Sequence, residues 1–130
     1  MRSFDTQVRV RYEETDAMGI VYHSKYFVWF EVARTEALRE TGFSYRKMEE
    51  SGLRLVVIEA SCRYVAPCRY DDIINIKTRL AEIKNTSLIF EYEVMRDEKQ
   101  VAQGRTTHVF TDASSRPIKI PPELKEALTS

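Results

Sequence analysis

The chain has 130 residues, of which 43% are hydrophobic, and this is enough apolar material for one domain with a single sizeable core. Lysine plus arginine and aspartate plus glutamate are equal at 20 each, so no overall charge favours nucleic acid, an anionic membrane or an acidic partner. We therefore expect a single domain over residues 1–130 that holds any anionic ligand with local groups.

The first ten residues carry charged side chains and lack the apolar core of a secretory signal, and no later run is long enough to span a membrane. Cys62 and Cys68 fall in one stretch that is expected to be extended, which separates them by roughly 20 Å. A disulfide needs Cα atoms within about 7 Å. We therefore expect two reduced thiols in a cytoplasmic protein.

The N-terminal third of the chain predicts one strand followed by one long helix. Residues 7–12, QVRVRY, alternate apolar and polar side chains, which predicts a half-buried strand with Tyr12 on its apolar face. Turn-forming residues follow as far as Gly19. Residues 25–41 have helical spacing, and their first two turns are apolar nearly all round, so this helix should be wrapped by other structure. Gly42 is expected to end the helix in the left-handed conformation.

The rest of the chain is mostly extended. A short helix is expected over residues 44–50, and a short terminal helix after the two prolines at 121–122. Four long strands are predicted between them, and their short connections imply antiparallel neighbours. The fold class is therefore α+β, an antiparallel sheet of about five strands wrapped around one long central helix. The four predicted strands cover residues 54–65, 72–82, 87–96 and 101–110.

The segment YEETDAMGIVYHSKY, residues 12–26, places titratable groups between the first strand and the long helix. Tyr12, Asp16 and His23 are its candidate catalytic residues, and Gly19 lets the backbone pass close to a bound group. In the structural alternative, Asp16 only forms a turn, Tyr12 is a strand aromatic and His23 merely precedes a helix. Spacing alone favours that alternative.

The helix that follows changes the balance. Its first amide groups have no acceptor within the helix and carry the positive end of the dipole, so they can stabilise a developing oxyanion. Acyl transfer needs such a group together with a nucleophile, or with a base that activates water. A carboxylate beside helix-start amides supplies both.

The positions that follow one another in and after this segment form a fairly specific pattern: Tyr12, Thr15, Asp16, Gly19, Val21, Tyr22, His23, Tyr26, Glu31, Ala33, Arg34, Thr35 and Glu36, with Pro67 and Asp71 further on. This pattern resembles the hotdog-fold thioesterases of the 4-hydroxybenzoyl-CoA thioesterase type. It is most similar to the bacterial acyl-CoA thioesterase branch that is associated with the Tol-Pal cell-envelope system.

The resemblance implies hydrolysis of an acyl-CoA thioester to a free carboxylic acid and coenzyme A. Asp16 would be the nucleophile or the general base, and the backbone amide of His23 would polarise the thioester carbonyl. The side chains of His23 and Tyr12 correspond to further functional positions. Met18 departs from the pattern, because close relatives often carry glycine there, and this bears on fine specificity more than on chemistry.

The resemblance also implies substrate contacts and an assembly. Gly19, Val21, Tyr22 and Tyr26 correspond to substrate-binding positions, although a helix-face aromatic such as Tyr26 is also typical of a core. Lys84 lies in a turn where relatives often carry basic residues for coenzyme A phosphates, and it fits a solvated loop lysine equally well. Active sites of the family lie between the subunits of a homodimer, often paired into a tetramer. An exposed edge strand gives independent reason to expect association.

No cofactor is expected, since coenzyme A is part of the substrate, and with only two histidines and no close Cys/His cluster we expect no metal site. His108 is expected to be structural. Two other functions fit the same fold. One is a hotdog dehydratase or hydratase, which also acts on acyl thioesters, and the other is a non-catalytic protein that binds acyl thioesters.

Overall fold

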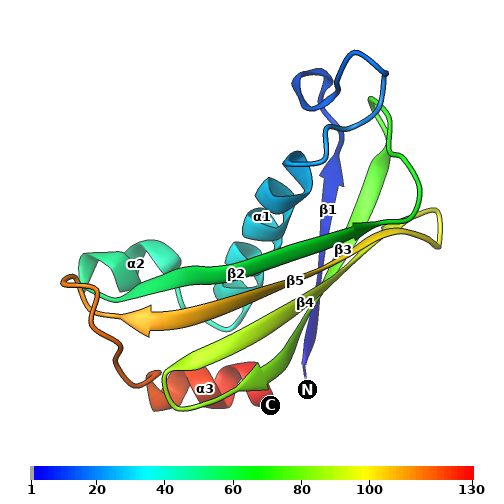
Figure 1. Cartoon of the computed structure of the whole chain (residues 1–130). Coiled ribbons are helices and arrows are strands. Elements are labelled where there is room, and N and C mark those ends of the chain that lie inside the picture. The colour runs from blue at the N-terminus through cyan, green and yellow to red at the C-terminus, as the bar shows by residue number, and fades with distance from the viewer. Residues whose placement is uncertain (1) are drawn as a thin grey trace.

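The computed structural model describes residues 2–130 and shows five strands and three α-helices (Figure 1). The strands form one antiparallel sheet in the order β1-β3-β4-β5-β2. The predicted element order and fold class are confirmed. The elements are β1 (Ser3–Arg9), the 3-10 turn η1 (Tyr12–Glu14), α1 (Lys25–Glu40), α2 (Tyr45–Glu50), β2 (Arg54–Tyr64), β3 (Ile73–Ile83), β4 (Ser87–Arg96), β5 (Lys99–Thr111) and α3 (Pro122–Thr129).

Helix α1 packs against one face of the curved sheet (Figure 1). Side chains alternate along each strand, so that every second residue of β3 and β4 is buried toward the helix. The ring of Phe30 stacks on Tyr92 at 4.3 Å between ring centroids. It also fills the space above Gly104, where an added Cβ would lie 2.2 Å from a ring atom. Gly104 is therefore required by this close approach, which fixes the depth at which α1 sits on the sheet.

The C-terminal end of α1 forms as predicted. Gly42 has a φ of 92°, and its amide donates to the carbonyl of Arg39 at 3.1 Å. The amide of Phe43 donates to the carbonyl of Leu38 at 3.3 Å. These two bonds are the Schellman arrangement that commonly terminates a helix.

The first strand differs from the prediction. β1 spans Ser3–Arg9, and Tyr12 lies beyond it in η1 with 77% of its surface exposed, so its expected place on the apolar face of the strand is wrong. The chain leaves the sheet because the amide of Arg11 donates to the carboxylate of Glu14 at 2.8 Å. The N-terminal extension of the strand forms because β3 is long enough to pair with it as far as Ser3.

The structure also bears on the environment of the chain. β2 ends at Tyr64, so Cys62 lies in the strand and Cys68 lies beyond it. Both cysteines are free, as expected. Within residues 2–130, no helix is long and apolar enough to cross a membrane. The single-domain organisation over residues 1–130 stays a prediction.

A row of three hydrogen-bonded polar side chains lies inside the core beneath α1. The Nε2 atom of His108 is 2.7 Å from the hydroxyl of Thr106, which is 2.6 Å from the hydroxyl of Tyr92. His108 is 0% exposed. Its burial, and secondarily the charge of Arg34, lower the pKa of His108 to about 3. The imidazole is therefore neutral, in keeping with the structural role expected for it.

Acidification should destabilise the fold through His108. Its pKa is about 3 in the folded protein and about 6.5 in an unfolded chain. Between these values the unfolded state binds more protons, so the free energy of unfolding decreases as the pH falls. The free energy of unfolding, measured with urea, should be about 1–2 kcal/mol lower at pH 5 than at about pH 6.5.

The substitution His108→Gln removes the imidazole that is protonated on unfolding. The decrease in the free energy of unfolding over the same pH range should therefore be smaller in this variant. The matched control is His23→Gln, which removes the exposed histidine and keeps His108. Equal pH dependence in His108→Gln and wild type would contradict this account of the core.

Candidate active site

The segment between β1 and α1 folds into a compact loop at the N-terminal end of α1 (Figure 1). Thr15 and Val21 form an isolated antiparallel bridge. Inside that bridge the amide of Asp16 donates to the carbonyl of Ile20, and the amide of Gly19 donates to the carbonyl of Asp16, both at 2.9 Å. Gly19 has a φ of 77°, a backbone conformation that favours glycine. The turn thus presents Asp16 at the tip of a small hairpin.

The carboxylate of Asp16 is only partly used by this turn. One oxygen, Oδ1, accepts the amide of Met18 at 2.8 Å. The other oxygen accepts no hydrogen bond from the described residues. Asp16 is therefore a turn residue, as the structural alternative holds, and it also keeps one carboxylate oxygen free for chemistry.

The start of α1 carries free amide groups. The N–H groups of His23 and Ser24 donate to no acceptor within residues 2–130. They precede a helix of 16 residues, whose dipole places partial positive charge at this end. The ring of His23 is exposed, and it lies 4.3 Å from the ring of Tyr22 between centroids. This end of the helix can hold an anion or a developing oxyanion.

Three hydrogen bonds join the approach to α1 to other parts of the chain. The amide of Val21 donates to the carbonyl of Cys68 at 2.9 Å, and the amide of Tyr22 donates to the carbonyl of Glu14 at 2.8 Å. The hydroxyl of Tyr64, on β2, donates to the carbonyl of His23 at 2.7 Å. The loop is therefore tied to η1, to the segment after β2 and to β2 itself.

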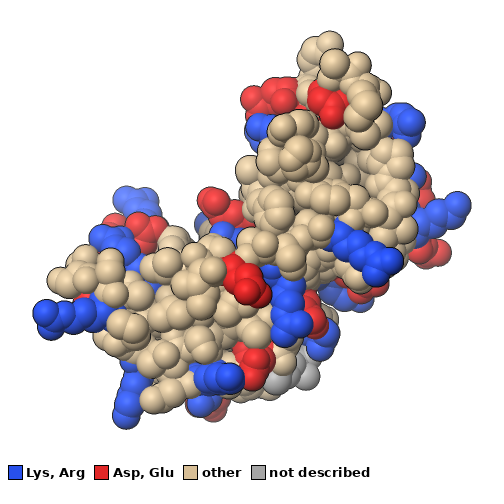
Figure 2. All heavy atoms as spheres, in the orientation of Figure 1, with Lys and Arg blue, Asp and Glu red and all other residues tan. Residues whose placement is uncertain are grey.

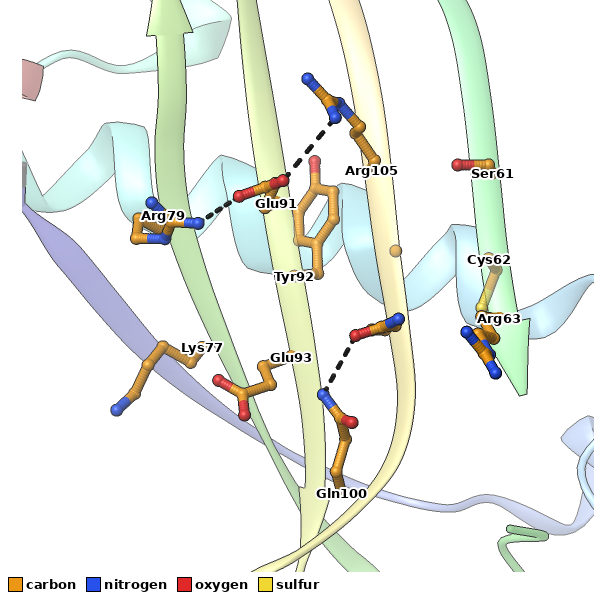
Figure 3. Close-up of a pocket in the computed structure, with 12 residues that line it drawn as sticks. Ser61, Cys62, Arg63, Lys77, Arg79, Glu91, Tyr92, Glu93, Gln100 and Arg105 are labelled. Carbon is orange, nitrogen blue, oxygen red and sulfur yellow. Dashed lines mark hydrogen bonds and ion pairs between the residues drawn. The ribbon is translucent and has the colours of Figure 1, made fainter. Parts of the chain in front are cut away.

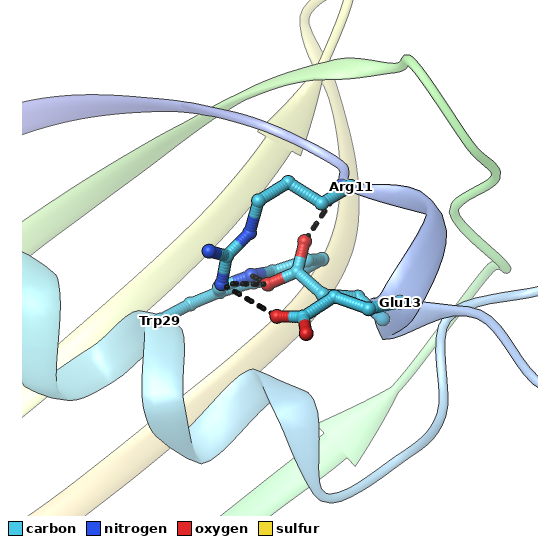
Figure 4. A network of polar contacts seen from close by, with 4 residues as sticks. Arg11, Glu13 and Trp29 are labelled. Carbon is cyan, nitrogen blue, oxygen red and sulfur yellow. Dashed lines mark hydrogen bonds and ion pairs between the residues drawn. The ribbon is translucent and has the colours of Figure 1, made fainter.

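A buried carboxylate that the sequence did not single out organises this region (Figure 4). Glu14 is 1% exposed. Its Oε1 atom accepts the amide of Arg11, and its Oε2 atom accepts the indole N–H of Trp29, both at 2.8 Å. The guanidinium of Arg11 adds a contact of 3.3 Å to Oε2. Nothing in the run RYEETD separates Glu14 from the exposed Glu13, and only the position of Trp29 on the buried face of α1 offers a signal.

The other predicted substrate-binding residues of this segment differ in burial. Tyr22 is exposed and Gly19 lies at the surface of the hairpin, whereas Val21 is buried. Tyr26 is buried against Trp29, and burial followed by the neighbouring Cys68 raises its pKa. In this chain Tyr26 supports the helix start as a core residue.

Tyr12 and Lys84 lie at opposite ends of β3. The ring of Tyr12 is exposed and meets the ring of Tyr70 edge to face, with 5.7 Å between the ring centroids. Lys84 follows the far end of β3, and its ammonium is 3.6 Å from Glu82. Because β3 is roughly 30 Å long at about 3.3 Å per residue, one chain does not bring Lys84 to the loop that carries Asp16.

Three hollows lie elsewhere on the surface. One of about 600 Å³ lies on the face of the sheet opposite α1, where Arg79 pairs with Glu91 and Arg105 lies 3.8 Å from the same glutamate (Figure 3). A second, of about 830 Å³, lies between α1, α2 and β2. A third adjoins the start of β3. None of the three is lined by a residue of segment 12–26. The side chain of Asp16 is half-buried in the single chain.

Most of the chain, residues 10–128, matches the thioesterase-like superfamily. The chain belongs to this family. The acyl-CoA thioesterase YbgC of Haemophilus influenzae is 35% identical over 126 residues, covering 95% of this chain and 93% of that protein. The acyl-CoA thioester hydrolase YbgC of Escherichia coli is 40% identical over 95 residues, covering 73% of this chain and 71% of that protein.

Solved structures agree with this assignment. DHNA-CoA thioesterase from Staphylococcus aureus superposes on this thioesterase-like protein with a TM-score of 0.94 at 29% identity, covering 99% of this chain and 90% of that one. The family and the hotdog fold implied by the sequence pattern are thereby confirmed. The individual roles of Asp16, His23 and Tyr12 stay predictions.

The Glu14 network provides a test of how the loop is held. In Glu14→Gln the side chain keeps its size, but one carboxylate oxygen becomes an NH₂ group that must face a buried N–H donor. The free energy of unfolding should fall by about 1–3 kcal/mol for one unsatisfied buried donor. The matched control is Glu13→Gln, since Glu13 is exposed and its carboxylate lies 3.4 Å from the guanidinium of Arg11. The free energy of unfolding of this variant should fall by no more than about 0.5 kcal/mol. Equal losses in the two variants, measured by urea unfolding, would contradict the anchoring role of Glu14.

Proposed function

We propose that this thioesterase-like protein hydrolyses an acyl-CoA thioester to a free carboxylic acid and coenzyme A. The observation that carries the proposal is the pairing, within one loop, of a carboxylate with a free oxygen on Asp16 and free amides at His23 and Ser24. The activities named for the Haemophilus influenzae and Escherichia coli relatives support it.

The proposed chemistry uses the two halves of the loop differently. The thioester carbonyl oxygen accepts the N–H of His23, where the positive end of the α1 dipole stabilises the negative charge that develops as the carbonyl is attacked. Asp16 either attacks the carbonyl carbon and forms a mixed anhydride, which water then hydrolyses, or removes a proton from the attacking water. In both routes the C–S bond breaks and coenzyme A leaves as the thiol. Single-turnover hydrolysis in oxygen-labelled water separates them, because only the anhydride route can place label in the Asp16 carboxylate.

The remaining assignments follow from the same surface. Tyr12 and the ring of His23 are exposed beside the turn that carries Asp16, and we assign them to substrate contact and proton transfer. Gly19 and Tyr22 form the rim of this surface. Water is the only co-substrate of this hydrolysis, and the proposal includes no cofactor and no metal. A cytoplasmic location is supported by the free thiols of Cys62 and Cys68.

A homodimer, with pairing into a tetramer, forms part of the proposal. β2 is an edge strand that, among the described strands, pairs with β5 alone. Most of its residues are exposed on both faces, including Val56, Val57 and Ile58. Val28 and Val32 of α1 are also exposed, and Figure 2 shows a wide uncharged area around the end of β2. An apolar edge of this kind invites pairing with a second copy, which would enclose the surface at Asp16.

The Asp16→Asn variant tests the chemistry directly. Asparagine keeps an oxygen that accepts the amide of Met18, so the turn should survive, while the group that attacks or removes a proton is lost. Thiol release from acyl-CoA should fall by about 10²- to 10⁴-fold. The matched control is Asp112→Asn, because Asp112 accepts the amides of Ser114 at 2.8 Å and Arg116 at 3.0 Å in another turn, and its turnover should match the wild type.

The assay should cover short, long and aromatic acyl-CoAs. Unchanged turnover in Asp16→Asn would remove Asp16 from the mechanism. Hydration of an enoyl thioester without thiol release would indicate the lyase alternative. Binding of acyl-CoA with no turnover of any substrate by the wild type would indicate the non-catalytic alternative.

The Ile58→Lys variant tests the assembly. Ile58 is 60% exposed on the edge strand, and a lysine there should weaken pairing with a second copy by charge repulsion and lost apolar contact. Sedimentation should show a smaller assembly than the wild type. Ile73→Lys, which alters an exposed apolar residue of β3, should keep the wild-type mass. An unchanged mass for Ile58→Lys would refute assembly through β2.

A further inference from the structure

Tyr64 contacts the backbone at the start of α1. It is the last residue of β2, and its hydroxyl donates to the carbonyl of His23 at 2.7 Å. Its ring meets the ring of Tyr26 edge to face, with 4.9 Å between the centroids. A side chain that is 44% exposed is thus turned back onto the backbone at the start of α1.

The carbonyl that Tyr64 contacts belongs to the same planar peptide unit as the N–H of Ser24. Holding the carbonyl therefore also fixes the direction of that N–H. A hydrogen bond to the carbonyl further polarises the peptide and makes the N–H a stronger donor. The N–H of Ser24 has no acceptor in the described chain.

The neighbouring peptide is held in a different way. The carbonyl of Tyr22, which shares a peptide unit with the N–H of His23, accepts the amide of Lys25 at 2.9 Å. Helix α1 itself therefore orients the His23 amide. The Ser24 amide is instead oriented by the side chain of Tyr64 from β2, which holds the carbonyl of the same peptide. Both free amides thus belong to peptides whose carbonyls are tied down.

We propose that Tyr64 is a positioning residue for catalysis, and that the amide it orients, that of Ser24, is a second donor to the thioester oxyanion beside the amide of His23. This inference rests on the proposed function. Tyr64 itself touches no reacting atom.

The chemistry of the Tyr64 hydroxyl suits this role. Burial, followed by the neighbouring Cys62, raises the pKa of Tyr64 to about 12, so the hydroxyl keeps its proton and donates throughout the neutral pH range. The backbone after Tyr64 is also fixed, because the amides of Val65 and Ala66 donate to the carbonyl of Val101 at 2.8 and 3.1 Å. The donor is therefore attached to a segment that is hydrogen-bonded to the end of the sheet.

We expect the hydroxyl of Tyr64 to contribute little to the stability of the fold. Helix α1 is already fixed by buried residues such as Trp29 and Phe30. In a partly exposed position the carbonyl of His23 can bond water when the hydroxyl is removed, so little stability should be lost. A positioned oxyanion donor, in contrast, acts mainly in the transition state and affects kcat.

Tyr64→Phe is the decisive variant, since it keeps the ring contact with Tyr26 and removes only the hydroxyl. We expect kcat for acyl-CoA hydrolysis to fall by about 10- to 100-fold, less than the full loss of a donor, with KM changed less than about threefold. The urea midpoint and the sedimenting mass should match the wild type. The matched control is Tyr45→Phe, which removes a hydroxyl that donates to the carbonyl of Leu55 at 3.4 Å, and it should keep wild-type kcat.

Other results would overturn the inference. Wild-type kcat in Tyr64→Phe would show that the hydroxyl does not orient a catalytic donor. A fall in kcat that accompanies a matching fall in the urea midpoint, or a smaller assembly, would show a purely structural role. The proposed function fails separately, if the wild type releases thiol from no acyl-CoA, because the inference compares the variant with an active wild type.

Discussion

The buried carboxylate of Glu14 is the interaction on which the arrangement of the loop depends. Placing a carboxylate in the interior costs several kcal/mol unless its oxygens are satisfied, and here both oxygens accept N–H groups from Arg11 and Trp29. One of these donors precedes the loop and the other lies in α1. The cost of burial is thus offset only when the end of β1 and the helix hold one relative position. The backbone carbonyl of the same residue accepts the amide of Tyr22, which extends this constraint to the helix start.

The position of Trp29 depends in turn on the contact between α1 and the sheet. Phe30 occupies the space that Gly104 leaves open and stacks on Tyr92. Adjacent helix residues point about 100° apart, so fixing Phe30 also fixes the direction in which the Trp29 indole reaches Glu14. A glycine in β5 therefore helps to place the amides of His23 and Ser24 at the start of α1. The packing of Phe30 in the core thus affects the geometry of the amides at the surface.

Much of the fold follows from local patterns in the sequence. The apolar positions of α1, the termination at Gly42 and the four long strands were all predictable, because periodicity and turn chemistry act over a few residues. The early end of β1 was not, since it depends on a bond from Arg11 to a side chain whose burial requires the helix to be in place. For the same reason Glu14 looked no different from Glu13.

The candidate site divides in a similar way. The loop, its turn at Asp16 and the free amides of the helix start follow from residues close together in the chain. The hydrogen bond from Tyr64 to His23 joins residues 41 positions apart, and only the sheet topology that places the end of β2 beside α1 creates it. Roles in acyl transfer were suggested by family resemblance, because a turn aspartate and a catalytic aspartate have the same local sequence signature.

The edge strand connects these observations. The strand whose unpaired edge and apolar side chains favour association is also the strand that supplies the donor to the His23 carbonyl. An edge strand in isolation is among the less stable parts of a sheet, and pairing with a second copy would restrict its motion. The orientation of the Ser24 amide would then be better defined in the assembly than in the single chain. In the proposed assembly, enclosure of the surface at Asp16 and alignment of the oxyanion donors would thus arise from the same event.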